Sequence, residues 1–231
     1  MPVRVSLTQP VWRQQDPGRP APPVDASLAG WEIQKRRRSH WNARRVYSGE
    51  TYFLKWFFHT RWSNPARREW ENARSLAALG IPTVLPVGWG VHSHGSYVVL
   101  LGSPGFQADE WERQRVPARH LQHHALRLAS YVARLHDARL CHRDLNVYHV
   151  LLYADTLRLI DVGRVMTFVR RRWIVKDLAS LLYSARRERI PPYICRLFFR
   201  TYLQTTRRNW KRRRILQAVE LKAERYRRHN A

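Results

Sequence analysis

The sequence is poor in cysteine, in acidic residues and in long apolar runs. Its 231 residues include only Cys141 and Cys195, which have no paired spacing and no metal-ligand companions and therefore suit a reducing cytoplasm better than a disulfide framework. No apolar run approaches the roughly 20 residues that span a bilayer, so we expect any membrane contact to be peripheral. Asp and Glu number 17 against 42 Lys and Arg, which gives a formal net charge of +25. This excess predicts an anionic partner, such as nucleic acid, an acidic membrane surface or a phosphorylated glycan.

The order of predicted elements indicates an α+β protein with two lobes. The prolines of residues 1–26 predict an extended, poorly ordered arm. Residues 27–105 read as a β-rich N-lobe, and residues 106–231 as a helical C-lobe. Strands are expected at residues 31–33, 45–47, 51–58, 84–89 and 97–101, with one inserted helix from 64 to 80. Helices are expected near residues 125–135, 174–185, 193–206 and 208–228.

Residues 141–152 hold the most informative pattern, Cys-His-Arg-Asp-Leu-Asn-Val-Tyr-His-Val-Leu-Leu. A His-Arg-Asp run is typical of the catalytic loop of kinase-like enzymes, whose Asp accepts the proton of the substrate hydroxyl. The side chain five positions later reaches a metal bound to phosphate, and a second Asp after a short strand binds Mg²⁺. The pattern therefore predicts Asp144 as the catalytic base, with Asp161 and His149 as metal ligands.

The catalytic run departs from protein kinases at two positions. His149 stands where an Asn is usual, and imidazole is a softer ligand than an amide oxygen. His149 could bind the metal, donate to a phosphate oxygen or hold the loop, and the sequence leaves these roles open. Asn146 replaces the Lys that contacts the γ-phosphate, which makes it a candidate phosphate contact. Arg164 is then a candidate to neutralise transition-state charge.

Lys55 is a lone cation in an apolar and aromatic strand, where an unpaired charge is costly to bury. The helix that follows resembles the kinase helix whose Glu holds this lysine against the ATP phosphates. Aligning Leu76 with that pattern selects Glu69 rather than Glu71. The alternative is a lysine at a strand edge whose stem lies on apolar surface, with both glutamates solvated.

No glycine-rich loop precedes Lys55. The basic residues 34–45 occupy its place, either to cover the nucleotide phosphates or as a solvated hairpin. Asp177 resembles the aspartate that supports the catalytic loop in kinases. It follows Asp161 so closely that a peptide-docking platform has little room, which favours a small or sugar acceptor.

Together these residues resemble the lipopolysaccharide core kinase (Kdo/WaaP) family. The similarity rests on residues 142–144 with His149, on Ile160-Asp161 without the usual Phe, on residues 171–178 and on the basic C-terminal helix. It implies a bilobal protein-kinase-like fold that uses ATP and Mg²⁺. It also implies phosphorylation of an inner-core sugar of lipopolysaccharide, a heptose or 3-deoxy-octulosonate, by a peripheral enzyme at the cytoplasmic face of the inner membrane.

Three alternatives compete with this interpretation. Charge and interleaved aromatic residues also suit a nucleic-acid-binding protein, which leaves the ordered set of Lys55, Glu69, Asp144 and Asp161 unexplained and is therefore disfavoured. A pseudokinase is suggested by the missing glycine loop and by His149. A phosphotransferase acting on another small molecule would share both fold and chemistry.

Overall fold

The protein forms two compact units in this computed structural model. One unit contains residues 1–75 and 84–103, and the other contains residues 76–83 and 104–231. The structure describes residues 11–14, 18, 20–25, 27–58, 64–92, 95–167 and 170–229. Each unit is considered separately below.

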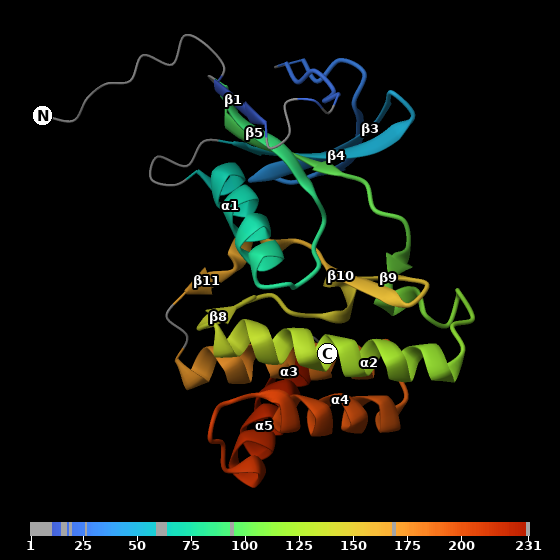
Figure 1. Cartoon of the computed structure of the whole chain (residues 1–231), viewed down its shortest axis with the longest axis vertical. Helices are drawn as coiled ribbons and strands as arrows, with labels where there is room; N and C mark the ends of the chain where they lie inside the picture. Colours follow the sequence, from blue (N-terminus) through green and yellow to red (C-terminus); the bar gives the residue numbers. More distant parts are fainter. Residues whose placement is uncertain are drawn as a thin grey trace, which may run out of the picture. The chain divides into compact units, whose positions relative to one another are not determined.

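The first unit contains an antiparallel sheet whose strand order is β1-β5-β6-β4-β3-β2 (Figure 1). Its strands are β1 (Val11–Gln14), β2 (Glu32–Arg36), β3 (His40–Tyr47), β4 (Glu50–Phe58), β5 (Pro86–His92) and β6 (Gly95–Leu101). On β4, Tyr52, Leu54 and Trp56 are buried in the main apolar cluster. Because side chains alternate along a strand, Lys55 lies on the opposite face. The five predicted strands are therefore present, and β1 is an additional one.

The turn between β3 and β4 contains Ser48 and Gly49, both of which have positive φ, 49° and 79°. Two successive positive φ angles match the right-handed twist of a tight hairpin, and glycine adopts them without steric cost. The hairpin turn predicted here is confirmed. The basic segment 34–45 also forms a hairpin, made of β2 and β3.

Helix α1 (Pro65–Ala78) lies between β4 and β5 in the chain. Within the first unit, its Trp70 ring contacts the ring of Trp89 on β5 at 6.5 Å. The helix ends at Ala78, and two residues later Gly80, whose φ is 64°, lets the backbone reverse. The following segment, which the sequence assigns to the N-lobe, groups with the second unit because Thr83 Oγ1 donates to the Leu159 carbonyl at 2.7 Å.

The second unit is mainly helical, as predicted. Its helices are α2 (Ala118–Asp137), α3 (Arg171–Arg187), α4 (Pro192–Thr205) and α5 (Arg212–His229). Helix α2 packs against α4, and α3 packs against α5. The last helix begins later than the predicted residue 208, because Asp137 accepts hydrogen bonds from Thr206 Oγ1 and from the Arg207 amide and holds the chain extended there.

Short strands support the segment between α2 and α3. They are β7 (Phe106–Gln107), β8 (Leu140–Cys141), β9 (Val150–Tyr153), β10 (Thr156–Leu159) and β11 (Met166–Thr167). Strand β8 pairs with β11, and β9 pairs with both β7 and β10. The catalytic run predicted from the sequence thus follows β8 and leads into β9.

Part of the segment 1–26, predicted as a poorly ordered arm, is paired in the sheet. Residues Val11–Gln14 form β1 and pair with β5, and the Pro20 carbonyl accepts a hydrogen bond from the Tyr52 hydroxyl at 2.8 Å. Residues 1–10 lie outside the described residues.

Among the helices that the structure describes, none has the length and apolarity needed to cross a membrane.

Candidate active site

Asp177 anchors the backbone of the catalytic run. Its side chain is fully buried on α3. Its Oδ2 accepts the His142 amide at 2.6 Å, and its Oδ1 accepts the Arg143 amide at 2.7 Å. Arg143 has a φ of 67°, a conformation that an L residue adopts only when its surroundings impose it. The support role predicted for Asp177 is confirmed.

His142 connects this run to the strand before Asp161. Its ring is fully buried, and Nε2 lies 3.2 Å from the Ile160 carbonyl. Burial lowers the pKa of His142, so the neutral ring donates its Nε2 proton to that carbonyl. The bond fixes the position of the residue that precedes Asp161.

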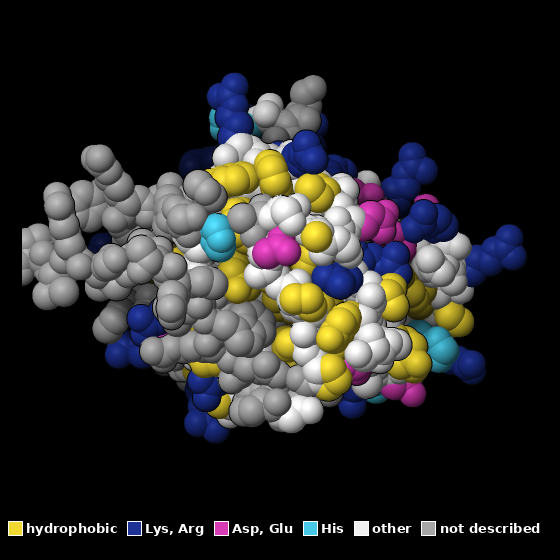
Figure 2. Space-filling model, turned by 90° about the horizontal axis from the view of Figure 1, so that it is seen from above, with side chains coloured by type: hydrophobic (Ala, Val, Ile, Leu, Met, Phe, Trp, Pro, Cys, Tyr) yellow, Lys and Arg dark blue, Asp and Glu magenta, His cyan; other side chains and the backbone are white. Residues whose placement is uncertain are grey.

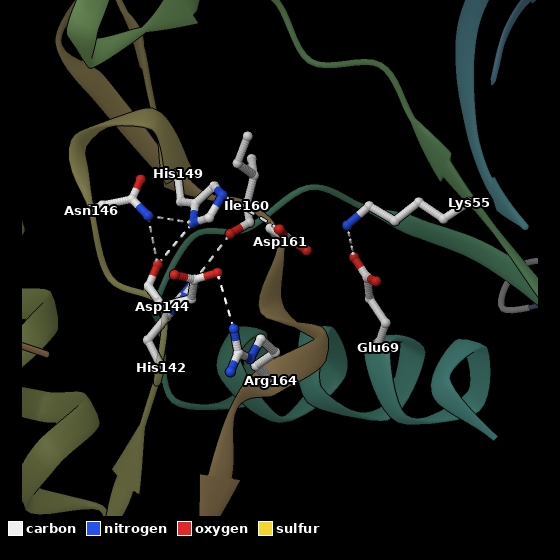
Figure 3. A network of polar contacts seen from close by, with 9 residues as sticks. All are labelled: Lys55, Glu69, His142, Asp144, Asn146, His149, Ile160, Asp161 and Arg164. Carbon is white, nitrogen blue, oxygen red and sulfur yellow. Dashed lines mark hydrogen bonds and ion pairs between the residues drawn. The ribbon is translucent and has the colours of Figure 1, made fainter. Parts of the chain in front are cut away.

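The tautomer of His149 follows from its contact with Asp144. His149 Nδ1 lies 2.8 Å from the Asp144 carbonyl oxygen, which can only accept. Nδ1 therefore carries the proton and donates it. The Asn146 Nδ2 group, 3.2 Å from the same carbonyl, is a second donor to it. In the neutral ring the Nε2 atom then carries the lone pair (Figure 3).

That Nε2 atom faces a carboxylate. It lies 3.3 Å from Asp161 Oδ2, so in the neutral ring its lone pair faces a carboxylate oxygen, an arrangement that a cation bound by both atoms would stabilise. Asp144, His149 and Asp161 each offer one ligand atom, and all of these atoms lie within 4.8 Å of one another. Nitrogen and carboxylate oxygen are ordinary ligands of divalent metals. The donor set therefore fits a divalent cation.

Asp161 and Arg164 lie on the short segment between β10 and β11. Asp161 has a φ of 56°, a left-handed conformation that Asp tolerates better than most residues. Arg164 Nη1 lies 3.5 Å from Asp144 Oδ2, and both side chains are partly exposed. The structure thus brings together five predicted residues in the second unit, namely Asp144, Asn146, His149, Asp161 and Arg164 (Figure 3).

The two remaining predicted residues meet in the first unit. Lys55 Nζ donates to Glu69 Oε1 at 2.5 Å, and Glu69 is 2% exposed (Figure 3). Glu71 instead pairs with Arg67 at 2.7 Å on the exposed side of α1. The selection of Glu69 over Glu71 is confirmed. A buried charge pair of this kind persists when its geometry is good, and breaking it leaves one charge uncompensated.

Sequence reasoning missed the contacts that tie the middle of the catalytic loop to α3. Ser184 Oγ accepts the Val147 amide at 3.1 Å, and the Tyr148 hydroxyl donates to Glu188. Burial raises the pKa of Tyr148 to about 12. The sequence did offer a signal for the serine contact. Ser184 lies between apolar residues at 181–182 and 185, and a hydroxyl buried among them requires a hydrogen-bond partner.

Solved structures with the same fold include two aminoglycoside phosphotransferases. One is an aminoglycoside-3'-phosphotransferase of type VIII, which is 17% identical with a TM-score of 0.56 over 85% of this chain and 95% of that chain. The other is APH(3'')-Id from Streptomyces rimosus, 19% identical with a TM-score of 0.58 over 84% and 93% of the two chains. The chain therefore has a protein-kinase-like fold.

The model of the lipopolysaccharide kinase (Kdo/WaaP) family matches residues 105–214 of the chain. The chain is 26% identical to the lipopolysaccharide core heptose(I) kinase WaaP of Pseudomonas aeruginosa, over 96% of this chain and 95% of that protein. The enzyme of the same name from Escherichia coli K12 is also 26% identical, over 78% and 80%. A solved structure of WaaP in complex with acyl carrier protein is 25% identical, with a TM-score of 0.65 over 84% of this chain and 88% of that chain.

Proposed function

We propose that the protein is an ATP-dependent kinase that phosphorylates an inner-core sugar of lipopolysaccharide, a heptose or 3-deoxy-octulosonate. The observation that carries the proposal is the cluster of Asp144, His149 and Asp161 on a loop anchored by Asp177. The relatives named as lipopolysaccharide core heptose(I) kinases support the choice of acceptor.

Asp144 is the proposed catalytic base. Its carboxylate accepts the proton of the acceptor hydroxyl as that oxygen attacks the γ-phosphate. The Asp144 backbone carbonyl is held by His149 and Asn146, so the side chain projects from a fixed position. Arg164, which pairs with Asp144, would neutralise charge that develops on the transferred phosphoryl group.

Mg²⁺ is the proposed metal, and Asp161 and His149 are its proposed ligands. When bound, the ion neutralises phosphate charge and orients the group that is transferred. The His149 Nδ1 bond to the Asp144 carbonyl keeps Nε2 directed at Asp161. In the first unit, Lys55 is proposed to contact the ATP phosphates, and Glu69 orients its ammonium group.

The deciding experiment incubates purified protein with γ-labelled ATP and dephosphorylated lipopolysaccharide core. We expect label to enter the core oligosaccharide. Mass spectrometry of the product distinguishes a phosphorylated heptose from a phosphorylated octulosonate. Transfer to an aminoglycoside or another small molecule, with none to the core, would contradict the proposed acceptor. An absence of transfer to every acceptor would favour a pseudokinase.

The His149 assignment predicts a change of metal preference. Imidazole favours Mn²⁺ over Mg²⁺ more than an amide oxygen does. His149→Asn should therefore keep appreciable activity and lower the ratio of Mn²⁺-supported to Mg²⁺-supported turnover several-fold, measured at saturating ATP. His229→Asn on the exposed end of α5 is the control. If His149→Asn lowers activity but leaves the ratio of Mn²⁺-supported to Mg²⁺-supported turnover unchanged, His149 donates a hydrogen bond to phosphate instead of binding the metal. If His149→Ala changes neither the activity nor this ratio, His149 is only a packing residue.

The Lys55–Glu69 pair predicts non-additive kinetics. Each single change to Ala should lower kcat/KM for ATP, and the double variant should lose little more than the worse single variant, because both changes abolish one ion pair. The coupling energy should be on the order of 1–3 kcal/mol. The exposed Arg67–Glu71 pair is the matched control, for which we expect coupling of roughly 0.5 kcal/mol or less. Additive losses at Lys55 and Glu69 would reject their common role.

We also propose a peripheral position on the acidic cytoplasmic face of the inner membrane. Lys and Arg side chains project from several sides of the face shown in Figure 2, among exposed hydrophobic side chains. Basic runs at residues 36–38, 170–172, 207–208 and 211–214 would attract anionic lipid headgroups.

The membrane proposal predicts selective, salt-sensitive binding to vesicles. Vesicles that contain acidic phospholipid or lipopolysaccharide should bind the protein, neutral vesicles should not, and binding should weaken as salt screens the charges. Sedimentation at several salt concentrations measures this. Tighter binding to duplex or single-stranded nucleic acid at matched physiological salt would instead favour the nucleic-acid alternative.

A further inference from the structure

A basic groove of about 560 Å³ lies between α3 and α5 in the second unit. Five cationic side chains line it, namely Arg171, Arg172, Lys176, Lys222 and Arg225. None of the described residues that line the groove is acidic. Trp173 and Leu221 contribute apolar surface. The groove therefore combines a high positive charge with a concave shape of a size that suits part of a small glycan.

The charges on the α3 side oppose the helix dipole. Arg170 is the residue at the N-cap and makes no side-chain cap, and Arg171 and Arg172 open the helix, whose first turn has no acidic residue. The N-terminus of a helix carries partial positive charge, so cations there are unfavourable and anions are stabilised. An anion bound beside the three consecutive arginines would offset the unfavourable interaction of their charges with the helix dipole.

The groove lies within electrostatic reach of the catalytic carboxylate. Burial, followed by the charges of Arg164 and Arg143, lowers the pKa of Lys176, and the charges of Asp177 and then Asp144 partly oppose this. On α5, burial raises the pKa of Tyr226, and the charges of Asp177 and then Asp144 add to the effect. Lys222 Nζ lies 5.0 Å from the Tyr226 ring.

Trp173 links the groove to the catalytic loop. Its ring lies 5.2 Å from the Arg143 guanidinium carbon, 5.0 Å from that of Arg172 and 5.6 Å from Lys176 Nζ. Arg143 directly precedes Asp144 on the loop, whereas Arg172 and Lys176 line the groove. A molecule whose hydroxyl is at Asp144 can therefore extend along Trp173 toward the cations.

We propose that this groove binds phosphate or carboxylate groups of the anionic saccharide acceptor, at a distance from the hydroxyl that is phosphorylated. This inference rests on the proposed function and names the part of the acceptor that the enzyme recognises. The occupant is the acceptor because Trp173, which lines the groove, also contacts Arg143, the residue next to the proposed base Asp144. A flat membrane surface does not fill a concave groove. Of the basic runs named above, we therefore assign 170–172, whose last two arginines line the groove, to the acceptor, and we assign membrane attraction to 36–38, 207–208 and 211–214.

The test compares two double variants that each remove two positive charges. Lys222→Gln with Arg225→Gln removes two cations from the groove, and Arg196→Gln with Arg200→Gln removes two exposed cations from α4. Thermal unfolding establishes that both are folded. Isothermal calorimetry without ATP and initial rates with ATP are measured with lipopolysaccharide core that retains its phosphates and carboxylates.

We expect the groove variant to bind this acceptor roughly tenfold more weakly or worse, with the loss in KM for the acceptor and not in KM for ATP. The α4 control should match the wild type. Removing the acceptor's phosphates, or reducing its carboxylates in a second sample, should weaken binding to the wild type without further effect on the groove variant. The sample that does so identifies the group that binds.

Equal acceptor affinity in the two double variants would overturn the inference, as would equal losses in both, which would indicate attraction by net charge alone. If the groove variant lost vesicle binding but kept acceptor affinity, the groove would be a membrane contact and the inference would fail. The proposed function fails separately, when the wild type transfers no phosphate to the core. In that case the calorimetric comparison still decides whether the groove binds the anionic glycan.

Discussion

Asp144→Asn should lower phosphoryl transfer to the acceptor by a factor on the order of 10² to 10⁴, the usual loss when a general base is removed. The amide keeps the size of the side chain but cannot accept the hydroxyl proton, so kcat should fall more than KM for either substrate. The measurement is initial rate with γ-labelled ATP and lipopolysaccharide core.

Stability should hardly change in this variant. Asp144 is partly exposed, and its ion pair with Arg164 spans 3.5 Å between partly exposed groups, which contributes little. Asp155→Asn, in the exposed turn between β9 and β10, is the matched control and should turn over at the wild-type rate. Near-normal turnover in Asp144→Asn would reject Asp144 as the base.

Asp177→Ala should lower the free energy of unfolding by about 3–5 kcal/mol. The change deletes a fully buried carboxylate that accepts two backbone amides, and it leaves buried donors without acceptors. Arg143 also loses the partner that holds its positive φ. Urea unfolding followed by far-UV circular dichroism measures the loss, and activity at a temperature where the variant is folded measures displacement of the loop.

A graded pair of substitutions separates these effects. Asp177→Asn keeps one oxygen acceptor and should destabilise less than Asp177→Ala. Asp155→Ala, an exposed control, should change the free energy of unfolding by roughly 0.5 kcal/mol or less. If Asp177→Ala were as stable as the wild type, the buried hydrogen bonds would not hold the catalytic loop.

Much of the fold could be predicted because local signals agree with the tertiary structure. Alternation on β4 placed Lys55 alone among apolar residues, and a buried cation requires the partner found in Glu69. Gly80 indicated where α1 ends, because glycine readily adopts the positive φ that it has there. The beginning of α5 was predicted too early, because Asp137 lies some 70 positions away in the chain and its capture of Arg207 leaves no local signal.

The role of His149 illustrates what sequence cannot supply. Its tautomer depends on a backbone carbonyl 2.8 Å from Nδ1, and the residue type alone carries no information about that contact. The partners Ser184 and Val147 are 37 positions apart, so only the packing of the helix on the loop brings them together. The positions of Asp144 and Asp161, by contrast, could be predicted from the His-Arg-Asp run and from the strand that precedes Asp161.

Helix α3 and its C-cap residue contact the catalytic loop at three points, through Asp177, Ser184 and Glu188. The loss of conformational entropy that ordering the loop requires therefore occurs when the helical unit folds, before any substrate binds. A substrate would then meet the proposed base, Asp144, in a position that is already set, and none of its binding energy would have to be diverted to assemble the loop. Helix α3 thus acts as the rigid reference against which the loop is aligned.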